Sequence, residues 1–393
     1  MLSRGALLAL FYVSGIAGLI YQVLWLRRLS LIFGVTVYAA STVLAAFMAG
    51  LAIGSALAGR VLKRGYSPLA AFGIAEVLVG VTGLVSPLLL DAASFLYAAV
   101  HHASPDSFGL LTVARLVSSF AILAVPTAMM GITLPLLSAA VSAPGRSNGT
   151  SIGLLYATNT LGAMTGTLLS GLMLIPAIGI QRSFLLAAIL NVAVGSLALW
   201  MARGEQRQSS TPQSPIDPQS AIRNPHSTAL AVVVAVSGFA SLGLEIAWFR
   251  LMLQFVIATT AAFTAMLATV LGGIAIGGGI AAWLLRVPRD RVATLGIVQA
   301  RAGVASAGSM SFLLWTVEQG WKTMGLKQTV LIAILPPAIC MGIGLPLALG
   351  VAGRRRDGDR EEDVARRVGS LYSLNVAGAI AGSLTAGFVL LPR

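Results

Sequence analysis

The sequence predicts an all-α membrane protein that crosses the bilayer many times and consists of two related halves. Three observations lead to this class. Of the 393 residues, 57% are hydrophobic and only 10% are charged, which leaves too few charges for the surface of a soluble protein. Many apolar runs reach the roughly 20 residues that a helix needs to cross a bilayer. The third observation is an internal repeat.

The repeat is clearest in a block that begins at Ser14 and returns at Ser237, 223 residues later. The two copies begin SGIAGLIYQVLWLRRL and SGFASLGLEIAWFRLM. Later blocks repeat as well, as MMGITLPLL with CMGIGLPLA, and as residues 153–176 with residues 369–392. A repeat of this length is the signature of an architecture built from two copies of one unit.

Eleven membrane spans are expected, each an apolar run of about the required length. They are residues 6–26, 33–59, 68–90, 112–140, 151–177 and 181–202, then 229–249, 255–285, 292–316, 328–350 and 368–392. Between the third and fourth spans, residues 91–107 are expected to lie along the membrane interface or to form a loop.

These spans divide the chain into three parts: a first repeat of six spans (1–202), a polar Pro- and Ser-rich linker (203–227) and a second repeat of five spans (228–393). By comparison with the first repeat, a twelve-span plan lacks its last helix within this sequence.

Basic residues indicate how the chain is oriented. With a cytoplasmic N-terminus, 17 Lys and Arg residues fall on the cytoplasmic side and 7 on the outer side, so the N-terminus and linker are expected in the cytoplasm. Six spans per half make the two repeats parallel, as in the bundle of major-facilitator transporters. The same bias explains the net charge of +13 without a nucleic-acid partner.

Two acids are expected at membrane depth, where charged side chains are costly and are candidates for function. Glu76 has Gln299 as its repeat equivalent, and Glu245 has Gln22. One acid from each half is suited to a cation or to a proton relay. The structural alternative is that each acid pairs with an arginine such as Arg301 or with a backbone group.

Two further pairs of repeated residues belong to the candidate site. Pro135 and Pro346 are expected to kink or break their helices, which in a transporter indicates the central site, although a packing kink explains them equally well. Asn159 and Asn375 either form hydrogen bonds across helices or line a pathway.

The repeated blocks resemble the membrane half of the bacterial fused transporter-like and spermidine synthase-like proteins. The resemblance is carried by SGIAGLIYQVLWLRRLSLIFG, STVLAAFMAGLAIGS, MGITLPLL and GLLYATNTLGAMTGTLLSGLMLIP, and it covers nearly all of residues 10–392. It implies an aminopropyltransferase-like domain, fused or associated, beyond Arg393. The glycine-rich loop and catalytic aspartates of such a domain are not in this sequence.

The sequence therefore predicts a transporter-like module, embedded in lipid, that binds or moves a small metabolite by alternating access. A cation such as a polyamine is the favoured substrate, and Glu76, Glu245, Gln22, Gln299, Arg301, Asn159 and Asn375 are the candidate binding residues. The alternative is a non-transporting anchor for a spermidine synthase-like enzyme. No catalytic constellation, metal site or cofactor is expected, and the single cysteine, Cys340, excludes a disulfide within the chain.

Overall fold

The computed structural model describes residues 4–34, 37–142, 148–206, 225–255, 260–287, 290–319, 326–354 and 359–390. Over these ranges the chain forms eleven α-helices and two π-helical segments. In chain order they are α1 (Arg4–Phe33), α2 (Val37–Leu62), α3 (Pro68–Ala103), α4 (Phe108–Ala140), α5 (Asn148–Leu168), η1 (Leu169–Leu174), α6 (Ile175–Gln206), α7 (Pro225–Phe255), α8 (Thr260–Leu284), α9 (Arg291–Glu318), α10 (Leu326–Ala352), α11 (Glu361–Thr385) and η2 (Ala386–Leu390).

The predicted class, an all-α protein with many membrane spans, is confirmed. Nine stretches of the described chain are long and apolar enough to cross a membrane. One of them, Gly149–Gly204, covers both α5 and α6, and α9 is not among the nine. Each of the eleven predicted spans overlaps one of the eleven α-helices of the described chain. Of the predicted linker, residues 207–224 lie outside the described ranges.

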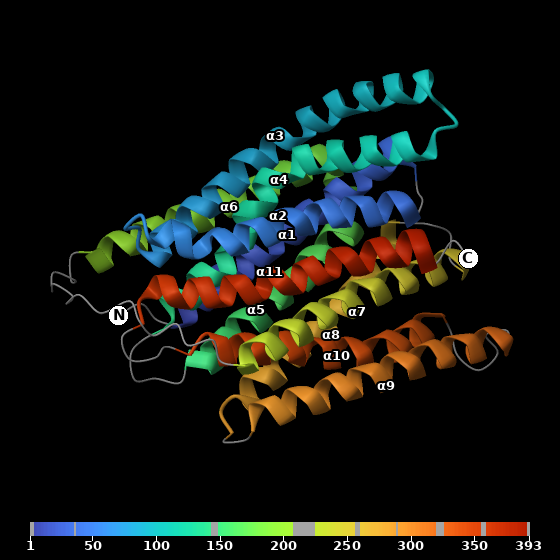
Figure 1. Ribbon diagram of the computed structural model, residues 1–393. Helices are drawn as coiled ribbons and strands as arrows, with labels where there is room; N and C mark the ends of the chain where they lie inside the picture. Colours follow the sequence, from blue (N-terminus) through green and yellow to red (C-terminus); the bar gives the residue numbers. More distant parts are fainter. Residues whose placement is uncertain are drawn as a thin grey trace.

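The third helix is longer than its predicted span. α3 continues through residues 91–103, which were expected to form an interfacial segment or a loop. Its 36 residues span about 54 Å, more than the roughly 30 Å of a hydrocarbon core, so the α3–α4 hairpin projects beyond the other helices (Figure 1). Two contacts stabilise this extension: Arg28 Nη2 lies 2.6 Å from Asp91 Oδ1, and Arg115 Nη2 donates to the Tyr97 hydroxyl at 2.8 Å.

The two halves pack in the same way. In the first half α1 packs on α5, α2 on α4, and α3 on α4; in the second half α7 packs on α11, α8 on α10, and α9 on α10. The halves meet along two pairs of helices, α2 with α11 and α5 with α8. In Figure 1 these inner helices lie between α3 on one flank and α9 on the other.

Glycines set the closest helix crossings, and they do so at equivalent places in both halves. A Cβ at Gly15 would overlap the backbone oxygen of Asn159, and a Cβ at Gly238 would overlap that of Asn375. Lipid supplies no hydrophobic force between helices, so small residues stabilise the bundle by letting backbones come into van der Waals contact. The repeat seen in the sequence is thus a repeat of helix crossings.

Neither Pro135 nor Pro346 breaks its helix, in contrast to the break considered from the sequence. α4 and α10 run without interruption through them. Because proline has no N–H, Pro135 leaves the Gly131 carbonyl without its usual helical donor. The Ser55 hydroxyl of α2 lies 2.8 Å from that oxygen and can donate to it. A neighbouring helix thus satisfies the freed backbone group, as expected in a membrane.

The irregular backbone lies elsewhere, in the two π-helical segments. η1 and η2 occupy equivalent positions of the repeat, and each contains a repeated glycine, Gly171 and Gly387. After η1, Gly179 has a φ of +78° within α6. This backbone conformation, which favours glycine, separates the fifth and sixth predicted spans in the absence of a loop.

The halves differ at their outer helices. α6 packs closely on α3: a Cβ at Gly80 would lie 2.8 Å from Val192 Cγ2 and 3.0 Å from the Ala188 oxygen. The equivalent glycine of α9, Gly303, has nothing within 4 Å of an added Cβ. Within the described chain, α9 has no counterpart of the contact between α3 and α6.

This difference predicts that one substitution, Gly to Val, changes the free energy of unfolding at one of two equivalent positions and not at the other. Gly80→Val inserts a side chain into the α3–α6 contact and should destabilise the protein by about 1–3 kcal/mol. Gly303→Val, on the open face of α9, should leave stability nearly unchanged. Thermal unfolding of both variants in one detergent is the measurement, and an equal loss of stability in both would contradict the packing described.

Candidate central cavity

A cavity of about 240 Å³ lies between the two halves. Its lining residues come from eight helices: α1, α2, α4 and α5 of the first half, and α7, α8, α10 and α11 of the second. α3, α6 and α9 contribute none of them. The polar lining side chains are Ser14, Gln22, Thr133, Tyr156, Asn159, Thr160, Ser241, Glu245, Tyr372 and Asn375.

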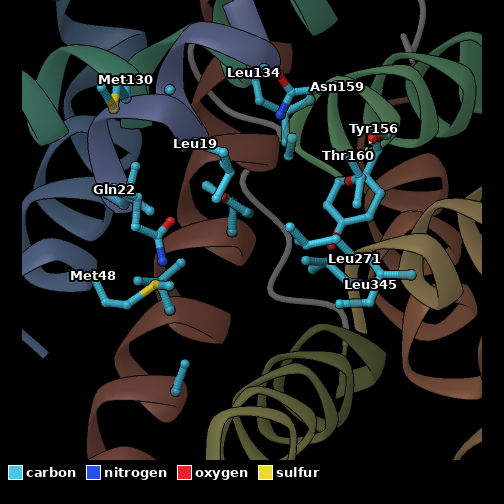
Figure 2. Close-up of a pocket in the computed structure, with 18 of the residues that line it drawn as sticks. Leu19, Gln22, Met48, Met130, Leu134, Tyr156, Asn159, Thr160, Leu271 and Leu345 are labelled. Atoms are coloured by element: carbon cyan, nitrogen blue, oxygen red, sulfur yellow. Dashed lines mark hydrogen bonds between the residues drawn. The ribbon is translucent and has the colours of Figure 1, made fainter. Parts of the chain in front are cut away.

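Four of the predicted site residues line this cavity: Gln22, Glu245, Asn159 and Asn375. They form two repeat-equivalent pairs, so each half contributes the same positions to the wall. In Figure 2, Gln22 lies beside Met48 on one side of the cavity, and Tyr156 lies with Thr160 on the other. The structure thus brings together residues that lie more than two hundred positions apart in the sequence.

Glu245 is the one lining residue with a formal charge. Its side chain is half-buried, and the described residues make no hydrogen bond or ion pair to its carboxylate. Its equivalent, Gln22, is buried and neutral. The cavity therefore presents an unpaired acid on one side of its pseudo-symmetric wall.

The two asparagines differ in their hydrogen bonds. Asn375 Nδ2 donates to the Val234 backbone oxygen at 2.9 Å, which ties α11 to α7. Among the described residues no such bond is made by the Asn159 side chain. Asn375 therefore combines the two roles considered from the sequence, a hydrogen bond across helices and a place in the cavity wall, whereas the Asn159 amide makes no hydrogen bond within the described ranges.

Glu76 does not line the cavity. It is 1% exposed, and its carboxylate accepts hydrogen bonds from Ser14 Oγ of α1 at 2.6 Å and from Asn191 Nδ2 of α6 at 2.5 Å. Neither partner is an arginine. Because Ser14 itself lines the cavity, Glu76 lies directly behind the wall.

The two remaining predicted residues lie on α9, away from the cavity lining. Gln299 is half-buried, and its Nε2 would lie 3.0 Å from a Cβ at Gly344 of α10. Arg301 is exposed on the outer surface. Gln299 was predicted as the repeat equivalent of Glu76, and Arg301 because it lies within a span. Both lie on a helix at the flank of the bundle, outside the cavity lining.

Several lining residues were not predicted, although the sequence contained a signal for them. Gly15, Gly18, Leu19 and Gln22 follow the spacing of one face of a helix. The same spacing in α7 gives Gly238, Ser241, Leu242 and Glu245. Residues three, four and seven positions apart share a helix face. Starting from Gln22 and Glu245, that rule identifies these neighbours.

The cavity has no cluster of metal-binding side chains within the described chain. No group of three His, Cys, Asp or Glu side chains in those ranges is placed to hold a metal ion. Cys340 is a free, half-buried thiol on α10. What the site provides is a polar wall with one acid, two tyrosines and several amides and hydroxyls.

No protein-family model matches the chain, and no curated protein matches it. Solved structures do. A bacterial homologue of the iron transporter ferroportin, in an outward-facing state with soaked iron, is 13% identical with a TM-score of 0.63, over 100% of this chain and 93% of that one. The human organic anion transporter MFSD10 is 14% identical with a TM-score of 0.59, over 99% and 95%.

A third similar structure is the E. coli fucose:proton symporter FucP, 15% identical with a TM-score of 0.58, over 98% of this chain and 95% of that one. The chain therefore has the fold of the major facilitator superfamily transporters and is a multi-pass membrane protein. The resemblance to the spermidine synthase-like fusion proteins gains no support from these comparisons.

The cavity predicts a difference in thiol reactivity between a half-buried serine of its wall, Ser241, and a fully buried serine outside it, Ser119. In a Cys340→Ser background, Ser241→Cys should react with a small water-soluble thiol reagent, because thiolate forms where water reaches the sulfur. Ser119→Cys, at a buried position of α4 outside the lining, should react at least about tenfold more slowly. Equal labelling rates in detergent would contradict a water-accessible cavity at Ser241.

Proposed function

We propose that this protein transports a small organic cation across the membrane by alternating access, with the Glu245 carboxylate binding the positive charge. The observation that carries the proposal is the unpaired acid in a cavity whose described lining residues include no basic side chain. A buried charge without a partner is costly, and a bound cation removes that cost.

The other lining residues fit an amine. Tyr156 and Tyr372 supply aromatic faces that attract cations, and hydroxyl and amide oxygens accept hydrogen bonds from ammonium groups. The two lining methionines, Met48 and Met130, and the phenylalanines Phe11 and Phe47 suit the methylene groups between the nitrogens. A cavity of about 240 Å³ limits the substrate to a small molecule.

Alternating access is supported by contacts between the halves on both sides of the cavity. Towards one end of the inner helices, Gly369 packs on the Ser55 oxygen. Towards the other end, the rings of Tyr38 and Phe388 lie 5.2 Å apart. If one set of contacts opens while the other stays closed, the cavity is exposed to one side of the membrane at a time.

Polyamines are the first amines to test, because the sequence resembles the membrane half of spermidine synthase-like fusion proteins. That resemblance also implies an aminopropyltransferase-like partner domain, for which this chain would serve as an anchor. The central cavity favours transport over anchoring alone, because an anchor does not need an unpaired acid between two packed halves.

The proposed orientation places the N-terminus in the cytoplasm of a bacterial-type inner membrane. It is supported by the 17-to-7 distribution of basic residues. The end of α2 and the start of α11 lie together, since a Cβ at Gly59 would lie 2.8 Å from Arg366 Cβ. Two of the basic loops thus belong to the same end of the bundle.

The substrate proposal predicts that Glu245→Gln weakens amine binding at least about tenfold, because a charge-assisted hydrogen bond contributes about 1.5–3 kcal/mol. Binding of putrescine and spermidine to purified protein, followed by calorimetry, and uptake into proteoliposomes are the measurements. Asp91→Asn, which neutralises an acid outside the cavity, is the matched control and should bind as the unaltered protein does.

A second variant tests the same site from the opposite half. Gln22→Glu adds an acid at the repeat equivalent of Glu245, so a diamine should gain more affinity than a monoamine of similar length. If neither amine binds, or if Glu245→Gln binds both as tightly as the unaltered protein, the cation proposal fails.

The orientation is tested by labelling in whole cells, in a Cys340→Ser background. A membrane-impermeant thiol reagent should label Asp106→Cys, at the exposed α3–α4 turn, without permeabilisation. Lys63→Cys, in the exposed turn after α2, should be labelled only after the cells are permeabilised. The reverse pattern would place the N-terminus outside.

A further inference from the structure

The acid behind the cavity wall has surroundings that differ from those of Glu245. Glu76 lies on α3, is 1% exposed and accepts two hydrogen bonds, from Ser14 Oγ at 2.6 Å and Asn191 Nδ2 at 2.5 Å. The donors belong to α1 and α6, so the carboxylate joins three helices of the first half.

No cation balances this carboxylate among the described residues. The ion pairs of those ranges are Arg28–Asp91, Arg366–Asp363 and Arg367–Asp359. The groups that face Glu76 are Ser14 and Tyr21 from α1 and Asn191 from α6, and α4, which also packs on α3, presents no charged group to it. The Tyr21 hydroxyl donates to the Gly80 oxygen at 3.5 Å.

One partner of Glu76 connects it to the cavity. Ser14 lines the cavity and at the same time donates to Glu76 Oε1. A hydroxyl group can accept a proton on one lone pair while it releases its own proton along a hydrogen bond. Ser14 is therefore placed between the cavity and a carboxyl group that the cavity does not reach directly.

The second half has no acid at this place. Gln299 is the equivalent of Glu76, and an added Cβ at Gly344 would lie 3.0 Å from Gln299 Nε2 and 3.8 Å from Ser237 Oγ. Ser237 is the equivalent of Ser14. The serine is thus present in both halves, while only the first half has a group beside it that can bind a proton.

We propose that Glu76 is a proton-binding site that exchanges its proton with the cavity through the Ser14 hydroxyl. In the loading step, a hydronium ion in the cavity gives a proton to Ser14 Oγ and becomes water. The proton that Ser14 already holds passes along its hydrogen bond to Glu76 Oε1. The carboxylate becomes a neutral carboxylic acid, Ser14 again has one proton, and the reverse sequence releases the proton.

Asn191 has a buried oxygen that suits this role. Its Nδ2 donates to Glu76 Oε2, whereas its Oδ1 is buried and has no hydrogen-bond partner among the described residues. Turning the amide would present Oδ1 as an acceptor to a protonated carboxyl group. The same residue can thus hold Glu76 in either protonation state, as a donor to the carboxylate or an acceptor from the acid.

This inference extends the proposed transport, since the proton bound at Glu76 and the cation bound at Glu245 would both be exchanged with one cavity, but its test needs no substrate. The probe is D₂O. Infrared difference spectra of the protein in nanodiscs, recorded from acidic to alkaline buffer, should show a protonated carboxyl C=O band that is absent in Glu76→Gln. In acidic D₂O the band shifts as its proton is replaced by deuterium, and the rate of that shift is measured.

If the proton moves through Ser14, Ser14→Ala should slow this exchange at least about tenfold, because the bridging hydroxyl is lost. Ser14→Thr keeps a hydroxyl and should exchange within about twofold of the unaltered protein. Ser241→Ala, which removes a different hydroxyl from the cavity wall, is the matched control. The deuterium exchange of the Glu76 carboxyl band should be as fast in this variant as in the unaltered protein.

Two results would overturn the inference. If Glu76→Gln removes no carboxyl band at any pH, Glu76 does not bind a proton. If Ser14→Ala exchanges as fast as the unaltered protein, or faster, the proton does not pass through the hydroxyl. Thermal unfolding of the Ser14 variants verifies that a slower exchange comes from a folded protein. Failure of amine binding at Glu245 would leave all of these outcomes unchanged.

Discussion

Close packing of helix backbones at glycine is the constraint on which the rest of the structure depends. In lipid, helices gain little from burying apolar side chains against one another, so the crossings at Gly15 and Gly238 supply van der Waals contact between backbones. The same crossings determine the site, because the backbone oxygens they meet belong to Asn159 and Asn375. Packing α1 on α5 and α7 on α11 therefore sets the position of one polar side chain from each half at the cavity wall.

The repeat made much of this fold predictable from the sequence. It indicated that equivalent helices would cross in the same way, and it paired Gln22 with Glu245, which both line the cavity, because equivalent positions in two copies of one unit lie at equivalent places. It did not distinguish Glu76 from Glu245. Both occur in apolar spans, and only the packing of α1 and α6 on α3 shows that Glu76 is enclosed by Ser14 and Asn191. The break considered at Pro135 does not occur for a related reason, since Ser55 on another helix can donate to the backbone group that Pro135 leaves free.

The fold alone does not identify a substrate. Proteins of the same fold are described as transporters of iron, organic anions, and fucose with protons, and each is less than 20% identical to this chain. Substrate choice in such a fold must come from the few side chains that line the cavity, since the helix crossings are common to all. Here the lining combines one acid with two tyrosines and no described basic residue, which is the opposite of what an anion requires.

Symmetric packing combined with asymmetric acids has a consequence for the transport proposed above. The halves are parallel repeats, so their common packing relates one half to the other and does not relate the two ends of the cavity. The contacts between the halves differ at the two ends, Gly369 on the Ser55 oxygen at one and Tyr38 on Phe388 at the other. A ligand shifts the equilibrium between the inward-open and outward-open arrangements only by the difference between its affinities for the two states. Glu245 lies in the cavity on a helix of the second half, whereas Glu76 lies behind the wall of the first half, so the two acids are placed unequally with respect to the two halves. That inequality allows a bound cation or proton to favour one arrangement over the other.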